Sequence, residues 1–261
     1  SWKSLSPDAF LSNLEKNQEL KAVVLEETPW VLQAKSESEN KKRVGLLFDL
    51  NKMSHEQFQA FKKLKKKQSS NGGFVWFDGG PDDWYITQHI ITGFSHLDKL
   101  GVIKVRENRE VWDMVYQAVK YCDDRMREEY EYMKRYAPKY KTENHLSYMA
   151  IQYLYMRSNF KDIELEKRNK EHFDYYKKQE QSYWLQNSRY MQGMIALSLH
   201  RYDDAKTPKD ILKSLKENSI NSEEMGMYWK ENYGYYWYEA PIEMQALMIE
   251  AFDEINNDTK S

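Results

Sequence analysis

Glycine and proline are scarce in this sequence, and that scarcity restricts the chain to a mainly helical fold. Only ten glycines and six prolines occur among 261 residues, whereas the two together make up about 12% of an average protein. Because these residues supply the turns and bulges of β proteins, an all-β sandwich is excluded. Helix-capping residues followed by apolar residues at helical spacing recur, as at Ser6-Pro7, Ser54 and Asp83. The pattern predicts about ten helices joined mostly by short connections.

The aromatic content indicates that this highly charged chain folds. A mean hydropathy of −0.90 and 31% charged residues are typical of disordered chains, but 8 Trp, 20 Tyr and 10 Phe supply large buriable surfaces. The net charge of −2 offers no general attraction to phosphate, and no stretch approaches 18 consecutive apolar residues. The sequence therefore predicts no nucleic-acid partner and no membrane insertion by this segment.

Residues 69–83 form a glycine-rich aromatic stretch, SSNGGFVWFDGGPDD, that precedes an apolar helix. The same plan returns near the end of the chain, where GMYW and YYWYEAP precede a second apolar helix. Such an echo predicts repeated helix hairpins, which stack either as an open solenoid or as a closed α/α toroid. Closure removes exposed ends, so we favour the all-α toroid.

Two segments of the chain resemble a known family. The matching residues are Gln68-x-x-Asn71-Gly72-Gly73-Phe74-x-Trp76 with Trp84-x-Ile86-Thr87, and Met225-Gly226-Met227-Tyr228-Trp229 with Pro241-Ile242-Glu243-x-x-Ala246. They resemble the helical thioester-type domain of the alpha-2-macroglobulin family, particularly its bacterial, Bacteroides-like members. The likeness runs from about Glu27 to the last helix. On this basis residues 1–261 are interpreted as one partial domain, excised from a larger multidomain protein and missing its first helices.

The resemblance implies a fold, a function and a location. The family's domain is an α/α toroid within a protein that inhibits proteases by trapping them through a conformational change. Implied partners are neighbouring domains of the full-length protein and the target proteases. The implied location is extracytoplasmic, in the periplasm or cell envelope, with a lipoprotein parent. The family's thioester needs Cys-x-Glu-Gln, but Cys122 is followed by Asp123, Asp124 and Arg125, so no thioester is expected within this chain.

Three acidic residues define the alternative function, a carbohydrate-active or terpene-cyclase-like toroid enzyme. Asp82 and Asp83 stand between Trp76 and Trp84, as a carboxylate pair under aromatic platforms would. The structural interpretation is that Asp83 caps the following helix. Glu243 falls in a first helical turn, where the helix dipole already favours a carboxylate.

No residue pattern predicts a catalytic site, a metal or a cofactor. Asp123-Asp124-x-x-x-Glu128 departs from the spacing of aspartate-rich magnesium motifs, and no two histidines stand four residues apart. His89 and His96 share a helix face, which core or groove positions explain. We therefore expect a protein that is not an enzyme.

Aromatic residues are the remaining candidates for binding. Tyr and Trp are favoured at interfaces because they bury a large area and keep a polar tip. The candidate domain-interface or binding residues are Trp76, Trp84, Tyr228, Trp229, Tyr235 and Trp237. The alternative is structural, with these side chains plugging one end of the ring.

Overall fold

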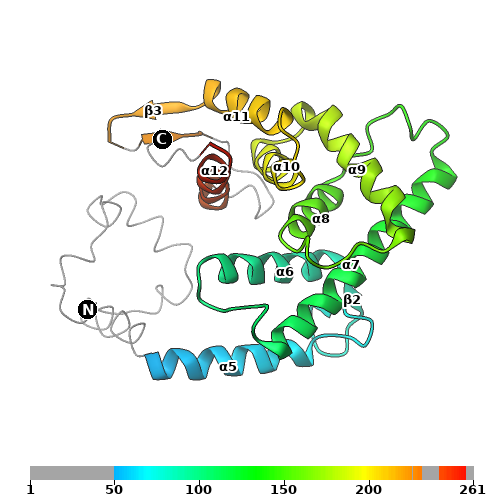
Figure 1. The fold of residues 1–261 in the computed structure, drawn as a ribbon, viewed down its shortest axis with the longest axis vertical. Coiled ribbons are helices and arrows are strands. Elements are labelled where there is room, and N and C mark those ends of the chain that lie inside the picture. The colour runs from blue at the N-terminus through cyan, green and yellow to red at the C-terminus, as the bar shows by residue number, and fades with distance from the viewer. Residues whose placement is uncertain (1–49, 225, 231–240, 257–261) are drawn as a thin grey trace. The chain divides into compact units, whose positions relative to one another are not determined.

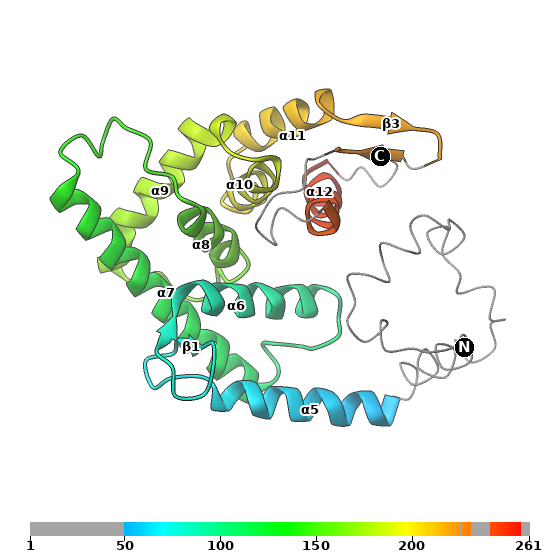
Figure 2. The same cartoon turned by 180° about the vertical axis from the view of Figure 1, so that it is seen from behind.

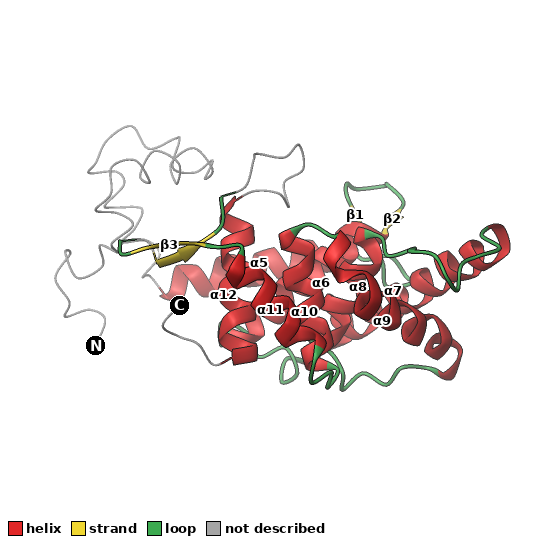
Figure 3. Ribbon diagram, turned by 90° about the horizontal axis from the view of Figure 1, so that it is seen from above, coloured by secondary structure: helices red, strands yellow, loops and turns green. Residues whose placement is uncertain are grey.

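The structure, a computed structural model, describes residues 50–224, 226–230 and 241–256. The chain divides into two compact units, Ser1–Lys63 and Leu64–Ser261, and most of the described residues belong to the second. Helices predominate and strands form only two short hairpins among the described residues (Figure 3), which confirms the all-α class. The first predicted helix, at Ser6-Pro7, lies outside the described residues.

Eight α-helices span most of the described chain. Their bounds are α5 Leu50–Lys66, α6 Trp84–Lys99, α7 Arg109–Tyr136, α8 Tyr148–Ser158, α9 Lys170–Tyr183, α10 Arg189–Arg201, α11 Thr207–Glu217 and α12 Pro241–Asn256. Short 3-10 turns at Lys167–Asn169 and Trp184–Gln186 flank α9. None of these described helices has the length and hydropathy that crossing a bilayer demands.

Side-chain caps explain where several helices begin. Asp83, Asn108, Ser147 and Ser188 each accept a hydrogen bond from the backbone N–H three residues later, which satisfies a donor that has no partner inside the helix. At the other end of α7, Pro138 cannot continue the helix, and α7 stops at Tyr136.

Helix α10 is central to the packing of the second unit, where it contacts α8, α11 and α12. Figure 1 shows α8, α10 and α12 side by side, with α11 packed on the outer side of α10. These four helices share one apolar core, to which α8 contributes Ile151, α10 contributes Leu197, α11 contributes Leu212 and α12 contributes Met248. α6 packs against α8 on one side and against the long helix α7 on the other.

The first glycine-aromatic stretch folds as an antiparallel hairpin, and the GMY residues of the second form one strand of another. β1 (Phe74–Val75) pairs with β2 (Asp82–Asp83), and β3 (Ile220–Ser222) pairs with β4 (Gly226–Tyr228). The first hairpin lies where α6 begins, beside α7 (Figure 2). In its described part, each copy of the echo therefore contributes to a short hairpin upstream of an apolar helix, while residues 235–240 of the second copy lie outside the described residues.

Candidate functional site

The glycine loop, residues 68–74, is held against α7 by its own amide side chains. Gln68 Nε2 donates hydrogen bonds to the carbonyl oxygen of Gly72 at 3.0 Å and to that of Met114 in α7 at 2.8 Å. Asn71 Oδ1 accepts one from the backbone N–H of Gly73 at 3.0 Å. The amide residues of the motif therefore shape the loop and join it to the helix.

The two glycines of the loop are required because it approaches α7 closely. Gly72 has φ +95°, a left-handed conformation, and a Cβ atom there would overlap the backbone carbonyl of Gln117. A Cβ atom on Gly73 would lie 2.8 Å from the ring of Tyr121 and from the Cβ atom of Asp82. Only residues without side chains fit at both positions.

Thr87 and Asp83 join the loop to the start of α6. The backbone N–H of Phe74 donates to Thr87 Oγ1 at 2.8 Å, and this hydroxyl donates to the carbonyl oxygen of Asp83 at 2.6 Å. Asp83 Oδ1 accepts a hydrogen bond from the N–H of Ile86 at 2.9 Å. The predicted helix-capping role of Asp83 is confirmed, and Phe74 is fully buried beneath it.

Asp82 and Asp83 use different partners. Successive residues of a strand point to opposite faces, and while Asp83 turns to the N–H groups of α6, Asp82 meets Tyr121. The Tyr121 hydroxyl, followed by a smaller effect of Asn71, lowers the pKa of Asp82 against the opposing effect of burial. Burial and the Asp82 carboxylate raise the pKa of Tyr121. The two aspartates do not converge as a catalytic carboxylate pair would.

Glu243 lies in the first turn of α12, near Tyr190 of α10. Its Oε2 atom is buried and has no hydrogen-bond partner among the described residues. Burial, followed by the Glu243 charge, raises the pKa of Tyr190 to about 12. Within the described part of the chain, no hydrogen bond or ion pair connects Glu243 with Asp82 or Asp83.

Four rings form an aromatic strip over the first hairpin and the N-terminal ends of α6 and α8. Trp76 is 57% exposed, and its ring centroid lies 6.3 Å from that of Tyr85 at an interplanar angle of 16°. The ring of Tyr85 is 6.5 Å from that of His89 and 6.2 Å from that of Tyr148. Of these four residues only Trp76 was predicted as a binding residue. In the sequence, the i, i+4 spacing of Tyr85 and His89 indicated that these two rings lie on the same helix face. No local pattern connected Tyr148 with them.

The other predicted aromatic residues differ in exposure. Trp84 is half-buried at the start of α6, and its indole Nε1 has no partner among the described residues. Tyr228 is half-buried in β4. Trp229 is 4% exposed; its Nε1 donates to the carbonyl oxygen of Leu215 at 2.8 Å, and its ring packs on Phe252. Trp229 is therefore a structural core residue. Tyr235 and Trp237 lie outside the described residues.

The cysteine and the aspartate that follows it are buried in α7. Burial raises the pKa of the Cys122 thiol. Asp123 Oδ1 accepts hydrogen bonds from the Tyr153 hydroxyl at 2.7 Å and from Arg157 Nε at 3.1 Å, so this carboxylate serves a buried ion pair. Within the described ranges no group of three or more His, Cys, Asp or Glu residues is arranged to hold a metal ion.

A cluster that the sequence analysis did not identify, here called the ionic clasp, joins α6, α10 and α12. It consists of Lys99, Arg201, Glu250 and Glu254. Arg201 donates to Glu250 at 2.7 Å and to Glu254 at 2.6 Å and 2.8 Å. Lys99 Nζ donates to the same two carboxylates at 2.9 Å and 2.8 Å. The i, i+4 spacing of the two glutamates on α12 was its only mark in the sequence.

Tyr155 extends the clasp to α8. Its hydroxyl donates to Glu250 Oε2 at 2.6 Å and lies 2.9 Å from His96 Nε2. Burial by itself would raise the pKa of Glu250, but the His96 hydrogen bond and the Lys99 and Arg201 charges outweigh it and lower that pKa strongly. Glu250 is therefore a carboxylate that depends on its cationic partners.

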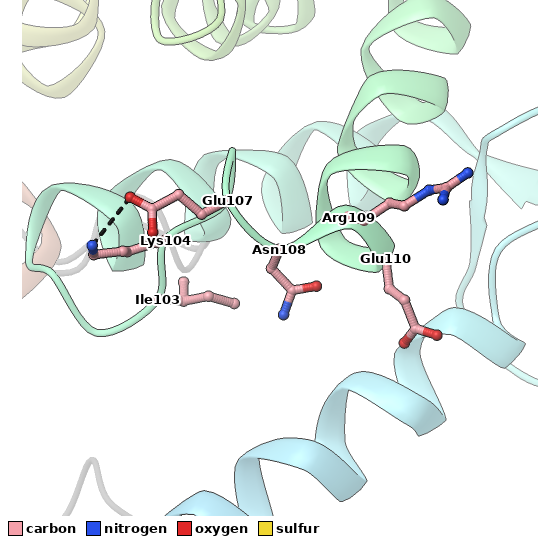
Figure 4. A pocket seen from close by; sticks show the side chains of 6 residues that line it. All are labelled: Ile103, Lys104, Glu107, Asn108, Arg109 and Glu110. Atoms are coloured by element: carbon pink, nitrogen blue, oxygen red, sulfur yellow. Dashed lines mark ion pairs between the residues drawn. The ribbon is translucent and has the colours of Figure 1, made fainter.

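An open pocket of about 530 Å³ lies at the N-terminal end of α7. Its lining residues are Ile103, Lys104, Glu107, Asn108, Arg109 and Glu110 (Figure 4). Lys104 and Glu107 face each other there in an ion pair of 3.1 Å, and Asn108 is occupied as the α7 cap. None of the residues predicted as sites lines this pocket.

Comparison of the sequence with models of known protein families and with curated proteins finds no match.

Proposed function

We propose that this chain is the helical domain of a bacterial alpha-2-macroglobulin-like protease inhibitor that acts by conformational trapping. In this proposal the domain is a non-enzymatic module of an α/α toroid, and its chain carries no thioester chemistry. It moves when a bait region elsewhere in the full-length protein is cut. The parent protein is extracytoplasmic, in the periplasm or cell envelope, and its partners are its own neighbouring domains and the trapped proteases.

The observation that carries the proposal is the interdependence of the motif residues on which the resemblance rests. Gln68, Gly72 and Gly73 fit the loop onto α7, and Thr87 fastens it to α6. A motif whose members are all needed for one geometry is stronger support for a family likeness than the same letters scattered over unrelated positions. The contact of each helix with the next along the chain, from α6 to α12, supports the proposed toroid.

The structural use of the acidic residues supports a non-enzymatic role. Asp83 caps α6, Asp82 bonds with Tyr121, and Asp123 pairs with Arg157. Each of these three aspartates therefore has a partner that accounts for its position without a substrate.

Trapping is tested with the full-length protein. After incubation with an excess of inhibitor, a protease should lose activity on a large protein substrate and retain it on a small peptide, because a trapped enzyme is enclosed but not blocked. In the full-length protein, Gly72→Val should abolish this difference, since it displaces the loop from α7, and Gly79→Ala should preserve it, since no atom lies within 4 Å of the added Cβ. Equal residual activity on both substrates would refute trapping.

The exposed aromatic strip is the observation that favours the carbohydrate-active alternative. Ring faces of this kind can stack on the apolar faces of sugars, and Trp76 presents such a face at the hairpin tip. In calorimetric titrations with a panel of soluble polysaccharides, this alternative expects binding that Trp76→Ala abolishes and that Phe77→Ala, at the neighbouring exposed ring, reduces less. Absence of binding to every polysaccharide would count against it.

A further inference from the structure

α9 differs from the other packed helices because its buried face is polar. Its buried residues are His172, Tyr176, Gln179 and Glu180. The neighbouring α10 buries mainly apolar residues, among them Ile195 and Leu197. Because polar side chains are stable in the interior only when bonded and uncharged or paired, the attachment of α9 depends on protonation states.

His172 is the buried titratable group of the N-terminal half of α9. It is 1% exposed and lies between two tyrosine rings, with centroid distances of 6.4 Å to Tyr130 and 6.2 Å to Tyr153. Neither ring nitrogen has a hydrogen-bond partner among the described residues. The site therefore accommodates a neutral imidazole.

The charged groups around His172 disfavour an imidazolium. From α7, Arg127 contributes a positive charge. The Tyr130 hydroxyl is bonded to Glu171 and the Tyr153 hydroxyl to Asp123. Glu171, on α9 itself, attracts a proton to His172, but its Oε1 atom already accepts hydrogen bonds from Tyr130 and from Lys134 of α7.

Glu180 is the buried titratable group of the C-terminal half. It has no exposed surface, and its Oε2 accepts one hydrogen bond, at 2.5 Å, from the Ser198 hydroxyl of α10. Oε1 has no partner among the described residues. Lys177, the nearby cation, directs its Nζ to the carbonyl oxygen of Tyr202, and the Tyr202 hydroxyl is also buried without a described partner. This setting suits a carboxylic acid better than a carboxylate.

We propose that mild acid changes which half of α9 opens more readily. Protonation of His172 loosens the N-terminal half of the helix, while Glu180, as a carboxylic acid, holds the C-terminal half more firmly. The two groups stand eight residues apart, which is about 12 Å along a helix. Each half therefore responds to the group that it contains.

A fall in pH changes the opening of the two halves of α9 in opposite directions. Burial, followed by Arg127, lowers the pKa of His172 to about 4, so the open state binds the proton more readily than the packed state, and opening becomes easier as pH falls from 6.5 towards 4. Burial raises the pKa of Glu180 well above its ordinary value. The packed state then holds that proton more tightly, and opening becomes harder as pH falls towards 4.5.

Amide hydrogen exchange with single-residue resolution tests the proposal at pH 7 and pH 5, after correction for the intrinsic exchange rate. The opening constant of amides in residues 170–176 should rise about 20-fold at the lower pH, while that in residues 177–183 should fall. His172→Phe should remove only the first response and Glu180→Gln only the second. His200→Gln, in α10, is the matched control and should change neither.

Both halves responding in the same direction, or neither responding, would overturn the proposal. If the variants do not fold, nuclear magnetic resonance titration of the wild-type protein decides. A pKa for His172 well below 6.5 together with a pKa for Glu180 well above 4.5 supports it. Ordinary values for either group overturn it.

Discussion

Trp76 and Trp229 illustrate how tertiary contacts assign different roles to identical side chains. Both follow glycine-containing stretches in the sequence, yet Trp76 is 57% exposed on the aromatic strip whereas Trp229 is 4% exposed in the core. The indole N–H of Trp229 is satisfied by Leu215, which is the usual condition for burying this side chain. Composition and spacing treat the two residues alike.

Gly72 and Gly79 form a matched pair for a stability test, because both have positive φ but only Gly72 lies against another backbone. Gly79→Ala should cost about 1–2 kcal/mol, the expense of a left-handed alanine. Gly72→Ala should cost at least about 2 kcal/mol more, because its Cβ also overlaps Gln117. Urea unfolding of both variants measures the difference, and equal losses would show that the contact with α7 is unimportant.

Asp123 and Arg157 allow the energetic role of a buried ion pair to be measured. Asp123→Ala should lower the free energy of unfolding by about 3–5 kcal/mol, because it leaves a guanidinium that is almost fully buried without its counter-charge. The control is Glu128→Ala, which breaks an exposed pair with Arg125 and should cost no more than about 1 kcal/mol. Chemical denaturation gives both values, and a loss for Asp123→Ala as small as that for Glu128→Ala would contradict the expectation.

Among the helices, α12 is attached in two ways. Its apolar face, with Leu247, Met248 and Phe252, joins the core shared by α8, α10 and α11, while Glu250 and Glu254 enter the ionic clasp. The apolar contacts do not depend on pH, but the clasp does. The attachment of α12 should therefore weaken in acid without being lost.

The pH dependence of the clasp has a definite sign. Glu250 has a lowered pKa in the folded protein. Its contribution to the free energy of unfolding is therefore fully present above the unfolded pKa of about 4.5 and is lost as pH falls towards and through the folded pKa. Glu250→Gln should cost about 1.5–3 kcal/mol at pH 7. The cost should shrink as pH falls below 4.5, because the unfolded wild-type chain then binds a proton at Glu250 that the folded protein does not bind, and this uptake favours unfolding.

Unfolding free energies measured from pH 7 to pH 3 check this prediction. The matched control is Glu217→Gln at the end of α11, a glutamate whose side chain is 65% exposed and lies 4.0 Å from Lys213. It should change stability by less than about 1 kcal/mol at every pH. A constant penalty for Glu250→Gln down to pH 3 would contradict the assigned role.

At the scale of the whole second unit, one core connects four helices, so damage at one point should destabilise all of them together. Leu197→Ala removes a fully buried side chain of α10 from that core and should cost about 2–5 kcal/mol. Leu185→Ala, at a side chain that is 67% exposed, should stay within about 0.5 kcal/mol. Tryptophan fluorescence and far-ultraviolet circular dichroism should give coincident unfolding curves for both variants, and separate curves would contradict a shared core.

The sequence by itself was sufficient for the helical class and for several helix boundaries. Few glycines and prolines, the capping side chain of Asp83 and Pro138 after α7 are local signals, and local hydrogen bonding is what begins and ends a helix. The predicted helix start at Ser54 was wrong, because α5 begins at Leu50 and already contains Ser54. It also marked residues 69–83 as a glycine-aromatic stretch ahead of an apolar helix, because a turn needs particular residues at particular positions, but the pairing of β1 with β2 and of β3 with β4 appears only in the structure.

Only the tertiary structure decided which polar residues are buried together. The ionic clasp joins Lys99 to Glu250 and Glu254 across about 150 residues, and the buried polar face of α9 has the same 3.6-residue periodicity as an exposed one. Periodicity shows that a helix has two faces but not which of them meets a neighbour. That choice depends on long-range packing, which brings together side chains that no local pattern connects.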